Sequence, residues 1–366
     1  MALQCNQFSP PFTQKALVMN EKEQVCVWDE APCPVLPPDE ALVRIEAVAL
    51  NPINTKMKTD FANPFAIMGA DFAGTVIAVG PEVVGVAVGD RVCGAQNEMF
   101  KATPEQGAFA QYTVTRRKMW MRIPNSWSME AAASLPVGIC TAGLAMKSLG
   151  LPLPDEPVAK PSAVLVYGSS TATATIAMQL LRLLNTNSGL LSKALRVIKK
   201  QWCTSIPAPH FPVKPDEISK ANRFPVAKKI YTRNNLKYAL DCISNVESTT
   251  VCFNAIGRTG GRYVALEPFP RHAANRAVVT TDFVIGPCIF GEGCTYPAPY
   301  AREPDEELHA FGVEVWEIAQ KLVHDGKLHH HPVRILDGGF DGIQEGLKLL
   351  SKKCVSGEKI VVRMET

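Results

Sequence analysis

The chain has 366 residues, 46% of them hydrophobic and 20% charged, which is enough to bury a core in two domains and excludes disordered and fibrous proteins. The most apolar stretch, Ala131–Met146, is interrupted by Pro136, Gly138 and Gly143, so we predict no membrane-spanning helix and no membrane partner. The N-terminus has no basic start followed by an apolar block. We therefore expect a cytoplasmic protein.

The formal net charge of +3 is too small to indicate a nucleic-acid partner, but the charge is unevenly distributed. Residues 184–230 contain nine Lys or Arg and two acidic residues, a local charge of +7, whereas the rest of the chain has 29 basic and 33 acidic residues. The eleven cysteines are scattered and no two are spaced Cys-x-x-Cys, which favours reduced thiols over a disulfide framework.

The N-terminal third consists of short apolar segments separated by Pro and Gly, a pattern typical of a small β-barrel. We expect strands at Lys15–Val18, Val25–Trp28, Ala41–Leu50, Ala73–Val79, Asp90–Cys93 and Ala108–Val114, with a first helical segment at Thr55–Asp60. Ser128 is a candidate N-cap for a helix over Met129–Ser134. Pro136 and Gly138 separate this helix from a second one at Thr141–Leu149.

Beyond Pro161, apolar strands alternate with helices, which is typical of a doubly wound parallel sheet and gives an α/β fold class. The expected strands are Ala163–Tyr167, Tyr238–Ile243, Arg262–Leu266 and Lys359–Val362, and the expected helices are Thr171–Leu184, Val246–Ile256, Glu306–His324 and Gly342–Ser351. Residues 185–228 depart from this plan, because five prolines leave room only for a weak strand near Leu195–Ile198.

The strand, turn and helix at Ala163–Leu184 are the strongest local signal for a ligand, because a helix N-terminus after a buried strand attracts phosphate. A glycine fingerprint is missing after Gly168, where Ser and Thr follow instead. The pattern leaves a nucleotide site and an ordinary capped helix open. The turn Gly257–Gly261 supports a nucleotide site only together with the strand, turn and helix at Ala163–Leu184.

The sequence offers few candidate residues for binding a metal or for acid–base catalysis. The Cys and His spacing predicts no metal site, and His329–His331 is interpreted as a surface loop. Lys56, with Asp71 to orient it, is a candidate proton or hydrogen-bond donor to an enolate, although most exposed lysines are simply solvated. Tyr112, Tyr263 and Tyr296 are weaker candidates, and no hydrolase or kinase motif is present.

Longer motifs resemble a known family. These are Val48–Lys56, Gly94–Met99, Gln106–Val114, Gly168–Ala174, Tyr238–Cys242, Ile285–Phe290 and Ser356–Val361. Over residues 2–184 and 229–366 the chain resembles zinc-free medium-chain dehydrogenase/reductases, and within them the fungal trans-acting enoyl reductases of polyketide biosynthesis. The resemblance implies a GroES-like barrel over 1–135, completed by 305–366, and a Rossmann domain over 136–304.

The resemblance also implies an activity and a site. The family reduces the α,β-double bond of a polyketide chain tethered to a partner polyketide synthase or PKS-NRPS, with NADPH as the hydride source. Lys56 is then the catalytic candidate. The implied cofactor-binding residues are Asn51, Pro52, Ile53, Asn54, Ser170, Thr171, Ala172, Thr173, Ala265, Leu266, Val355 and Ser356. The implied substrate-binding residues are Gly138, Ile139, Cys140, Thr141, Ala142, Gly143, Leu144, Ala145, Gly286, Pro287, Cys288, Ile289 and Phe290; from the residues alone, core packing is the simpler interpretation of both stretches.

The segment 185–228 lacks the family's second Rossmann strand and the turn that meets the adenosine 2′-phosphate. We interpret it as a frameshifted or mis-spliced reading of the gene; as a genuine segment it would impair NADPH binding. Two other functions stay open, a stand-alone quinone or enone reductase and a degenerate, non-catalytic synthase-binding protein. Pro287, expected in an edge strand, would hinder pairing there and favours a monomer.

Overall fold

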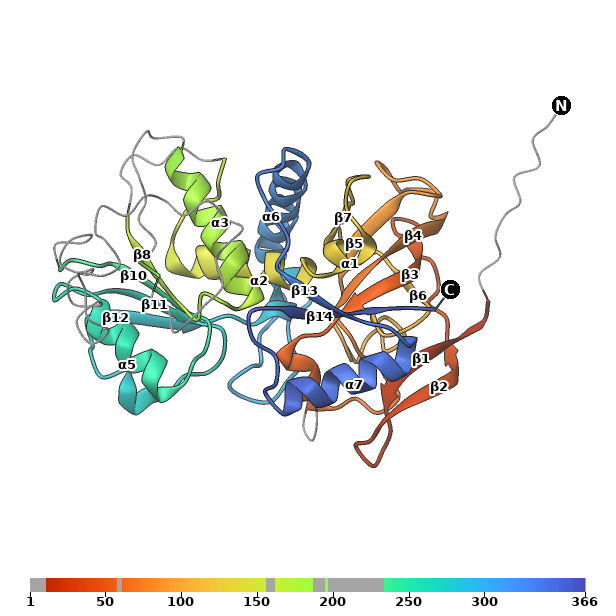
Figure 1. Ribbon diagram of the computed structural model, residues 1–366, viewed down its shortest axis with the longest axis horizontal. Coiled ribbons are helices and arrows are strands. Elements are labelled where there is room, and N and C mark those ends of the chain that lie inside the picture. Colours follow the sequence, from red (N-terminus) through yellow and green to blue (C-terminus); the bar gives the residue numbers. More distant parts are fainter. Residues whose placement is uncertain (1–10, 58–60, 156–161, 187–194, 197–233, 366) are drawn as a thin grey trace. The chain divides into compact units, whose positions relative to one another are not determined.

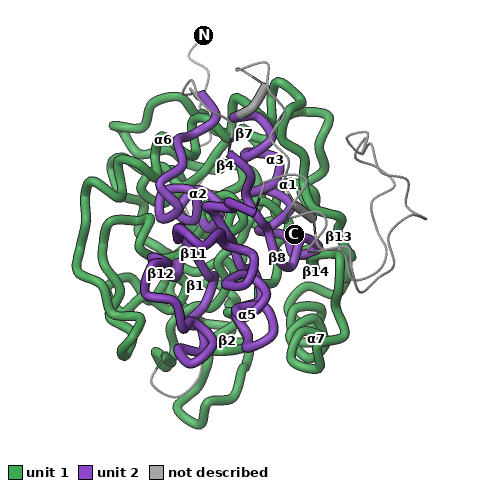
Figure 2. The backbone as a smooth tube through the Cα atoms, turned by 90° about the vertical axis from the view of Figure 1, so that its left-hand side faces the viewer, with its two compact units in different colours: residues 1–140, 286–366 green, residues 141–285 purple. Residues whose placement is uncertain are grey.

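The computed structural model describes residues 11–57, 61–155, 162–186, 195–196 and 234–365. They form two compact units, the first made of residues 1–140 and 286–366 and the second of residues 141–285 (Figure 2). The first unit therefore contains both chain ends, and the second is inserted into it. Most of the anomalous segment 185–228, including Trp202–His210, lies outside the described residues.

The first unit is built on antiparallel strands, as the barrel pattern predicted (Figure 1). Its hairpin consists of β1 (Thr13–Met19) and β2 (Val25–Pro32), and its larger sheet has the order β13-β14-β3-β4-β5-β7, with β6 paired to β3. The larger sheet comprises β3 (Ala41–Ala49), β4 (Asp71–Val79), β5 (Arg91–Ala95), β6 (Tyr112–Val114), β7 (Trp120–Arg122), β13 (Val333–Leu336) and β14 (Lys359–Arg363).

Helices pack against this sheet and against one another. They are η1 (Pro52–Thr55), α1 (Met129–Ala133), η4 (Gly286–Phe290), α6 (Glu306–His324) and α7 (Gly339–Ser351). Ser128 caps α1, its hydroxyl accepting a hydrogen bond from the Ala131 N–H at 3.2 Å, as the sequence predicted. Phe72, Phe109 and Ile360 belong to the buried apolar cluster between the strands and α7.

The second unit holds a parallel sheet of order β12-β11-β10-β8-β9, which confirms the doubly wound fold. Its strands are β8 (Val164–Tyr167), β9 (Leu195–Arg196), β10 (Tyr238–Asp241), β11 (Gly261–Ala265) and β12 (Val279–Phe283), and its helices are α3 (Ala172–Thr186), α5 (Val246–Ala255) and the short η3 (Arg271–Ala273). The strand order reverses between β8 and β10, so right-handed crossovers place α3 and α5 on opposite faces (Figure 1).

Several boundaries differ from the sequence prediction for local reasons. No break separates Pro136 from Thr141: α2 (Pro136–Leu149) begins at the proline, because the first helical position needs no N–H donor. Likewise η1 begins at Pro52 rather than Thr55, and Asp60 lies outside the described residues. Strands β7, β12 and β13 were missed because they are short and partly exposed.

One further expectation was wrong, and another held only in part. Pro287 lies in the 3-10 helix η4 rather than in an edge strand such as β12, so the argument from this proline for a monomer does not hold. In the histidine loop, His329 and His330 are exposed but His331 is buried. Burial lowers the pKa of His331 to about 4, and the neighbouring Lys359 and His330 add to this effect.

The stretch Met129–Leu149 is long and apolar enough to cross a bilayer by length and composition. However, 78% of its most apolar window is buried inside the protein, as in the core helix of a folded domain. Its hydropathy is therefore explained by packing.

Candidate active site

The turn between β3 and β4 carries the predicted cofactor residues Asn51–Asn54. Pro52 opens η1, and the Asn51 N–H donates to Asn54 Oδ1 at 2.6 Å, which closes the turn. Lys56 ends η1 with its N–H bonded to the Ile53 carbonyl at 2.8 Å, and its side chain is exposed. The predicted catalytic lysine is thus accessible on a fixed backbone.

Asp71, the first residue of β4, is fully buried and accepts three hydrogen bonds. The donors are Lys359 Nζ at 2.5 Å, Asn51 Nδ2 at 2.7 Å and the Val137 N–H at 2.6 Å. Lys359 is itself buried, in β14. A buried charge pair is stable only with such additional donors, so this arrangement holds the Asn51 side chain in one orientation.

The sequence analysis paired Asp71 with Lys56, but in the structure the ammonium bound to Asp71 is that of Lys359. The two lysines differ in environment, since Lys359 is buried and Lys56 exposed. One sequence signal could have identified Lys359: it directly precedes the apolar run Ile360–Val362 of the final strand, where an unpaired lysine would be costly.

Glu98 is a second buried carboxyl that the sequence analysis did not single out. It accepts hydrogen bonds from Asn54 Nδ2 at 2.9 and 2.7 Å and from the Gly69 N–H at 2.8 Å. Burial raises the pKa of Glu98 to about 7, although the hydrogen bonds from Gly69 and Asn54 oppose the shift. The carboxyl of Glu98, which contacts η1 through Asn54, therefore has a pKa near neutrality.

Asn51 and Asn54 connect these carboxyls into one buried polar network, which runs through Lys359, Asp71, Asn51, Asn54 and Glu98. Its members come from β14, β4, η1 and the loop after β5. The network fixes both side chains of the predicted cofactor turn while Lys56 stays exposed. It can therefore position a polar ligand group beside a lysine.

In the second unit, the carboxyl ends of the parallel strands bring together a different set of predicted residues. Tyr167, Asp241 and Ala265 are aligned on neighbouring strands. The next residue of each strand, Gly168, Cys242 or Leu266, therefore lies at the same carboxyl end of the sheet. The strand order reverses between β8 and β10, and ligands of doubly wound sheets bind at this reversal.

Gly168 allows the chain to turn tightly at this end of the sheet. Its φ is +77°, and a Cβ there would lie 2.8 Å from Ile243 Cγ1. The next residues, Ser170–Thr173, form the N-terminus of α3, where Thr171 Oγ1 accepts a hydrogen bond from the Ala174 N–H at 3.2 Å. Backbone N–H groups and hydroxyls at a helix N-terminus suit a phosphate.

Asp241, the last residue of β10, holds the chain at the same carboxyl end of the sheet by hydrogen bonds. It is fully buried and accepts hydrogen bonds from the Tyr263 hydroxyl at 2.9 Å and from the Ile243 and Ser244 N–H groups at 3.0 Å each. Burial and Asp241 raise the pKa of Tyr263. Tyr263, a weak catalytic candidate by sequence, is therefore a buried structural donor.

The remaining predicted residues are divided between the units. Val355 and Ser356 lie between α7 and β14, and Val355 packs against the same apolar cluster as Ile53. The substrate stretch Gly138–Ala145 lies in α2 and is buried except at Thr141. In Gly286–Phe290, Ile289 is buried against α6 near Gly312, whereas open space surrounds the Cβ position of Gly286.

Among the described residues, no group of three or more His, Cys, Asp or Glu side chains converges in a way that could hold a metal ion. Asp71 is bound by Lys359, and Cys93 is buried in β5. The two buried carboxylates near η1, Asp71 and Glu98, are thus hydrogen-bonded to protein groups.

A barrel-like antiparallel unit joined to a parallel sheet, with polar residues at η1 and at the sheet reversal, defines the medium-chain dehydrogenase/reductase class. Residues 37–125 match the family model of the alcohol dehydrogenase GroES-like domain. Full-length relatives narrow the assignment: the chain belongs to the fungal trans-enoyl reductase family.

Three relatives support this. The chain is 54% identical to the lovastatin nonaketide synthase enoyl reductase component lovC of Aspergillus terreus, covering 98% of each chain. It is 54% identical to the dehydrogenase mokE of Monascus pilosus, covering 98% of this chain and 99% of the relative. It is 41% identical to the trans-enoyl reductase FSL5 of Gibberella zeae, covering 96% and 97%.

Solved structures support the fold. The alcohol dehydrogenase superfamily protein from Novosphingobium aromaticivorans superposes with a TM-score of 0.67 at 21% identity, over 96% of this chain and all of that one. The CurK enoyl reductase superposes with a TM-score of 0.66 at 15% identity and the same coverage.

Proposed function

We propose that this chain is a trans-acting enoyl reductase, an NAD(P)-dependent oxidoreductase that reduces the α,β-double bond of a polyketide chain held by a partner polyketide synthase or PKS-NRPS. The observation that carries this proposal is the near full-length similarity to trans-enoyl reductases, one of them a named component of a polyketide synthase. The buried polar network behind η1 and the strand reversal in the second unit are consistent with it.

The residues of the second unit fit a dinucleotide. Gly168 makes a left-handed turn at which a Cβ would clash with Ile243, and the N-terminus of α3 offers N–H groups and hydroxyls for a pyrophosphate. When bound, the dinucleotide supplies the hydride for the β-carbon of the enoyl thioester. We propose NADPH as this dinucleotide on the family resemblance; the segment expected to meet the 2′-phosphate lies mostly outside the described residues.

In this proposal, Asn51–Asn54, Ser170–Thr173, Ala265–Leu266 and Val355–Ser356 line the NADPH site, and Gly138–Ala145 with Gly286–Phe290 line the acyl site. Lys56 donates a hydrogen bond or a proton to the developing enolate. Its exposure at the end of η1, next to two asparagines fixed by buried carboxyls, supports this role.

We further propose that residues 1–135 with 305–366 form the catalytic domain and that residues 136–304 bind NADPH, as the family resemblance implies, although the compact units divide the chain after residues 140 and 285. We also propose that the protein is a cytoplasmic monomer. Light scattering of the purified protein during gel filtration tests the monomer directly, and a mass of twice the chain overturns it.

The function is tested in two steps. NADPH binding is followed by fluorescence titration, with NADH as the comparison; the proposal expects tighter binding of NADPH. Reduction is then measured with an enoyl chain on the partner synthase and with free small enones. Turnover that requires the carrier-bound chain supports the proposal, whereas efficient reduction of free enones alone identifies a stand-alone enone reductase.

The role of Lys56 is tested with Lys56→Gln beside Lys22→Gln, an exposed lysine in the β1–β2 turn. We expect Lys56→Gln to lower kcat about 100-fold or more while the Kd for NADPH stays unchanged. Lys22→Gln should leave both values unchanged. Equal kcat for the two variants would remove Lys56 from the chemistry.

A further inference from the structure

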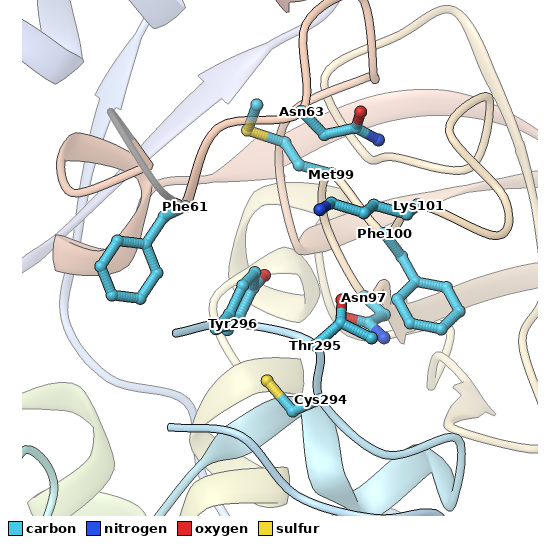
Figure 3. Close-up of a pocket in the computed structure, with 9 residues that line it drawn as sticks. All are labelled: Phe61, Asn63, Asn97, Met99, Phe100, Lys101, Cys294, Thr295 and Tyr296. Atoms are coloured by element: carbon cyan, nitrogen blue, oxygen red, sulfur yellow. The ribbon is translucent and has the colours of Figure 1, made fainter. Parts of the chain in front are cut away.

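A pocket in the first unit lies outside the residues proposed above to bind the cofactor or the acyl chain. Three separate segments line it: Phe61 and Asn63 after η1, Asn97 and Met99–Lys101 after β5, and Cys294–Tyr296 after η4. Figure 3 shows these side chains converging from the three segments. The pocket therefore forms within one unit and depends on that unit's packing alone.

Its walls are mainly apolar and fixed by aromatic contacts. The rings of Phe61 and Tyr296 lie 5.4 Å apart, and the Tyr296 hydroxyl donates to the Glu98 carbonyl at 3.3 Å. The guanidinium of Arg116 lies 5.3 Å from the ring centre of Phe100. Such walls suit methylene and methyl groups.

One polar group in the pocket lacks a partner. Asn97 is 2% exposed, and its Nδ2 has no hydrogen-bond partner in the described part of the protein. A buried donor without a partner is unfavourable and uncommon in folded proteins, so Asn97 is poised to bind a ligand oxygen. A ligand amide is complementary to a carboxamide side chain in either orientation, because it offers both an acceptor and a donor.

Lys101 adds a positive charge at the pocket rim. It is exposed, lines the pocket, and makes no ion pair with any described acidic residue. An ammonium group there favours an anionic ligand group such as a phosphate. The pocket thus combines an apolar wall, a buried amide and a cation.

The pocket also adjoins the candidate active site through a single residue. Glu98 binds Asn54 of the cofactor turn, whereas its neighbours Asn97 and Met99 line the pocket. A ligand in the pocket is therefore separated from η1 only by the Glu98 segment. The pocket thus lies close to η1, which ends at Lys56.

We infer that this pocket binds the 4′-phosphopantetheine arm that carries the acyl chain, with one arm amide hydrogen-bonded to Asn97 and the phosphate beside Lys101. The inference rests on the proposed function, because only a substrate bound to a carrier protein or to coenzyme A has such an arm. The enclosed part of the pocket has room for about one water molecule, so only the carbonyl oxygen of one arm amide enters it, while the rest of the arm lies along the rim.

The first test measures binding of free 4′-phosphopantetheine and of pantetheine, which lacks the phosphate, by calorimetry on the full chain. We expect wild type to bind 4′-phosphopantetheine about three- to fivefold more tightly, and Lys101→Gln to abolish that preference. Asn97→Leu, which fills the same space without the amide, should weaken binding of both ligands. Lys22→Gln serves as the charge-matched control and should behave as wild type.

The second test measures KM for enoyl thioesters of N-acetylcysteamine, pantetheine, coenzyme A and a holo carrier protein. Lys101→Gln should raise KM only for the two substrates with a 4′-phosphate, and the comparison of coenzyme A with the carrier protein identifies the source of the arm. Equal effects of Lys101→Gln on all four substrates, or no phosphate preference in wild type, would overturn the inference. If wild type reduces none of the four, the proposed function itself fails.

Discussion

The two units build their candidate sites by opposite means. The first unit uses five buried side chains from four separate segments, joined through Asp71 and Glu98. The second uses consecutive residues at the end of one strand, Gly168–Thr173, whose main contribution is backbone shape. Buried charges make large, interdependent energetic contributions, whereas turn and cap contacts make small and local ones. Substitutions in the buried network of the first unit should therefore lower stability more than substitutions in the turn and helix cap of the second unit.

The largest effect is expected at the ion pair of Asp71 and Lys359. Asp71→Asn leaves the Lys359 ammonium buried without a counter-charge, which should lower the free energy of unfolding by about 3–5 kcal/mol. Urea denaturation measures this loss. Asp29→Asn breaks the exposed pair with Lys15 and should cost no more than about 1 kcal/mol. Similar losses in the two variants would contradict the view that the buried network dominates the first unit.

The pH dependence of Glu98 should give the next largest effect. The pKa of Glu98 is about 7 in the folded protein and about 4.3 in an unfolded chain, so between these values the native state retains a proton that the unfolded state releases. Stability from this group therefore falls as the pH rises from about 4.3 to 7.

Glu98→Gln removes this titration. The stability of wild type relative to Glu98→Gln should fall by roughly 1–3 kcal/mol between pH 5 and pH 8, measured by urea denaturation. Glu40, whose pKa burial also raises to about 7, is present in both proteins and cancels in the comparison. Glu345→Gln on the exposed face of α7 is the control, and the same pH trend there would argue against a role for Glu98.

The shape of the turn after β8 is tested by Gly168→Ala. The new Cβ combines a φ of +77° with a contact of 2.8 Å to Ile243, so we expect a loss of about 1–2 kcal/mol in stability and at least tenfold weaker NADPH binding. Gly85→Ala is the matched control, since its φ is +87° but no atom lies within 4 Å of the added Cβ. NADPH binding as strong as wild type in Gly168→Ala would exclude close approach of the cofactor at this turn.

The smallest effect compares two similar helix caps, one in each unit. Thr171→Ala and Ser128→Ala each remove a side-chain acceptor from a helical N–H at 3.2 Å, and each should cost about 1 kcal/mol. Only Thr171→Ala should also weaken NADPH binding, by a few-fold, because only α3 is proposed to bind the cofactor. Fluorescence titration of both variants measures this difference, and equal affinities would assign the Thr171 hydroxyl to helix capping alone.

Local sequence patterns predicted the second unit better than the first. The strands at Tyr167, Asp241 and Ala265, and the helix after Thr171, follow from continuous apolar runs and helix signals within about fifteen residues. By contrast, the first unit contains β7 and β13, which are short and have little hydrophobic alternation. These strands form because β5 and β14 offer them partners distant in the sequence.

The sequence by itself determined the α/β class, the parallel sheet, the Gly168 turn and the family, because each is carried by short runs of residues that can be recognised one by one along the chain. Only the tertiary structure decided that Asp71 pairs with Lys359 rather than with Lys56, that Glu98 binds Asn54, and that Asn97 Nδ2, in the same pocket as Lys101, has no hydrogen-bond partner among the described residues. The physical reason is that a buried charge or amide is satisfied by whichever group the fold brings within hydrogen-bond distance. For Asp71 that group lies 288 positions away along the chain, beyond the reach of any local pattern.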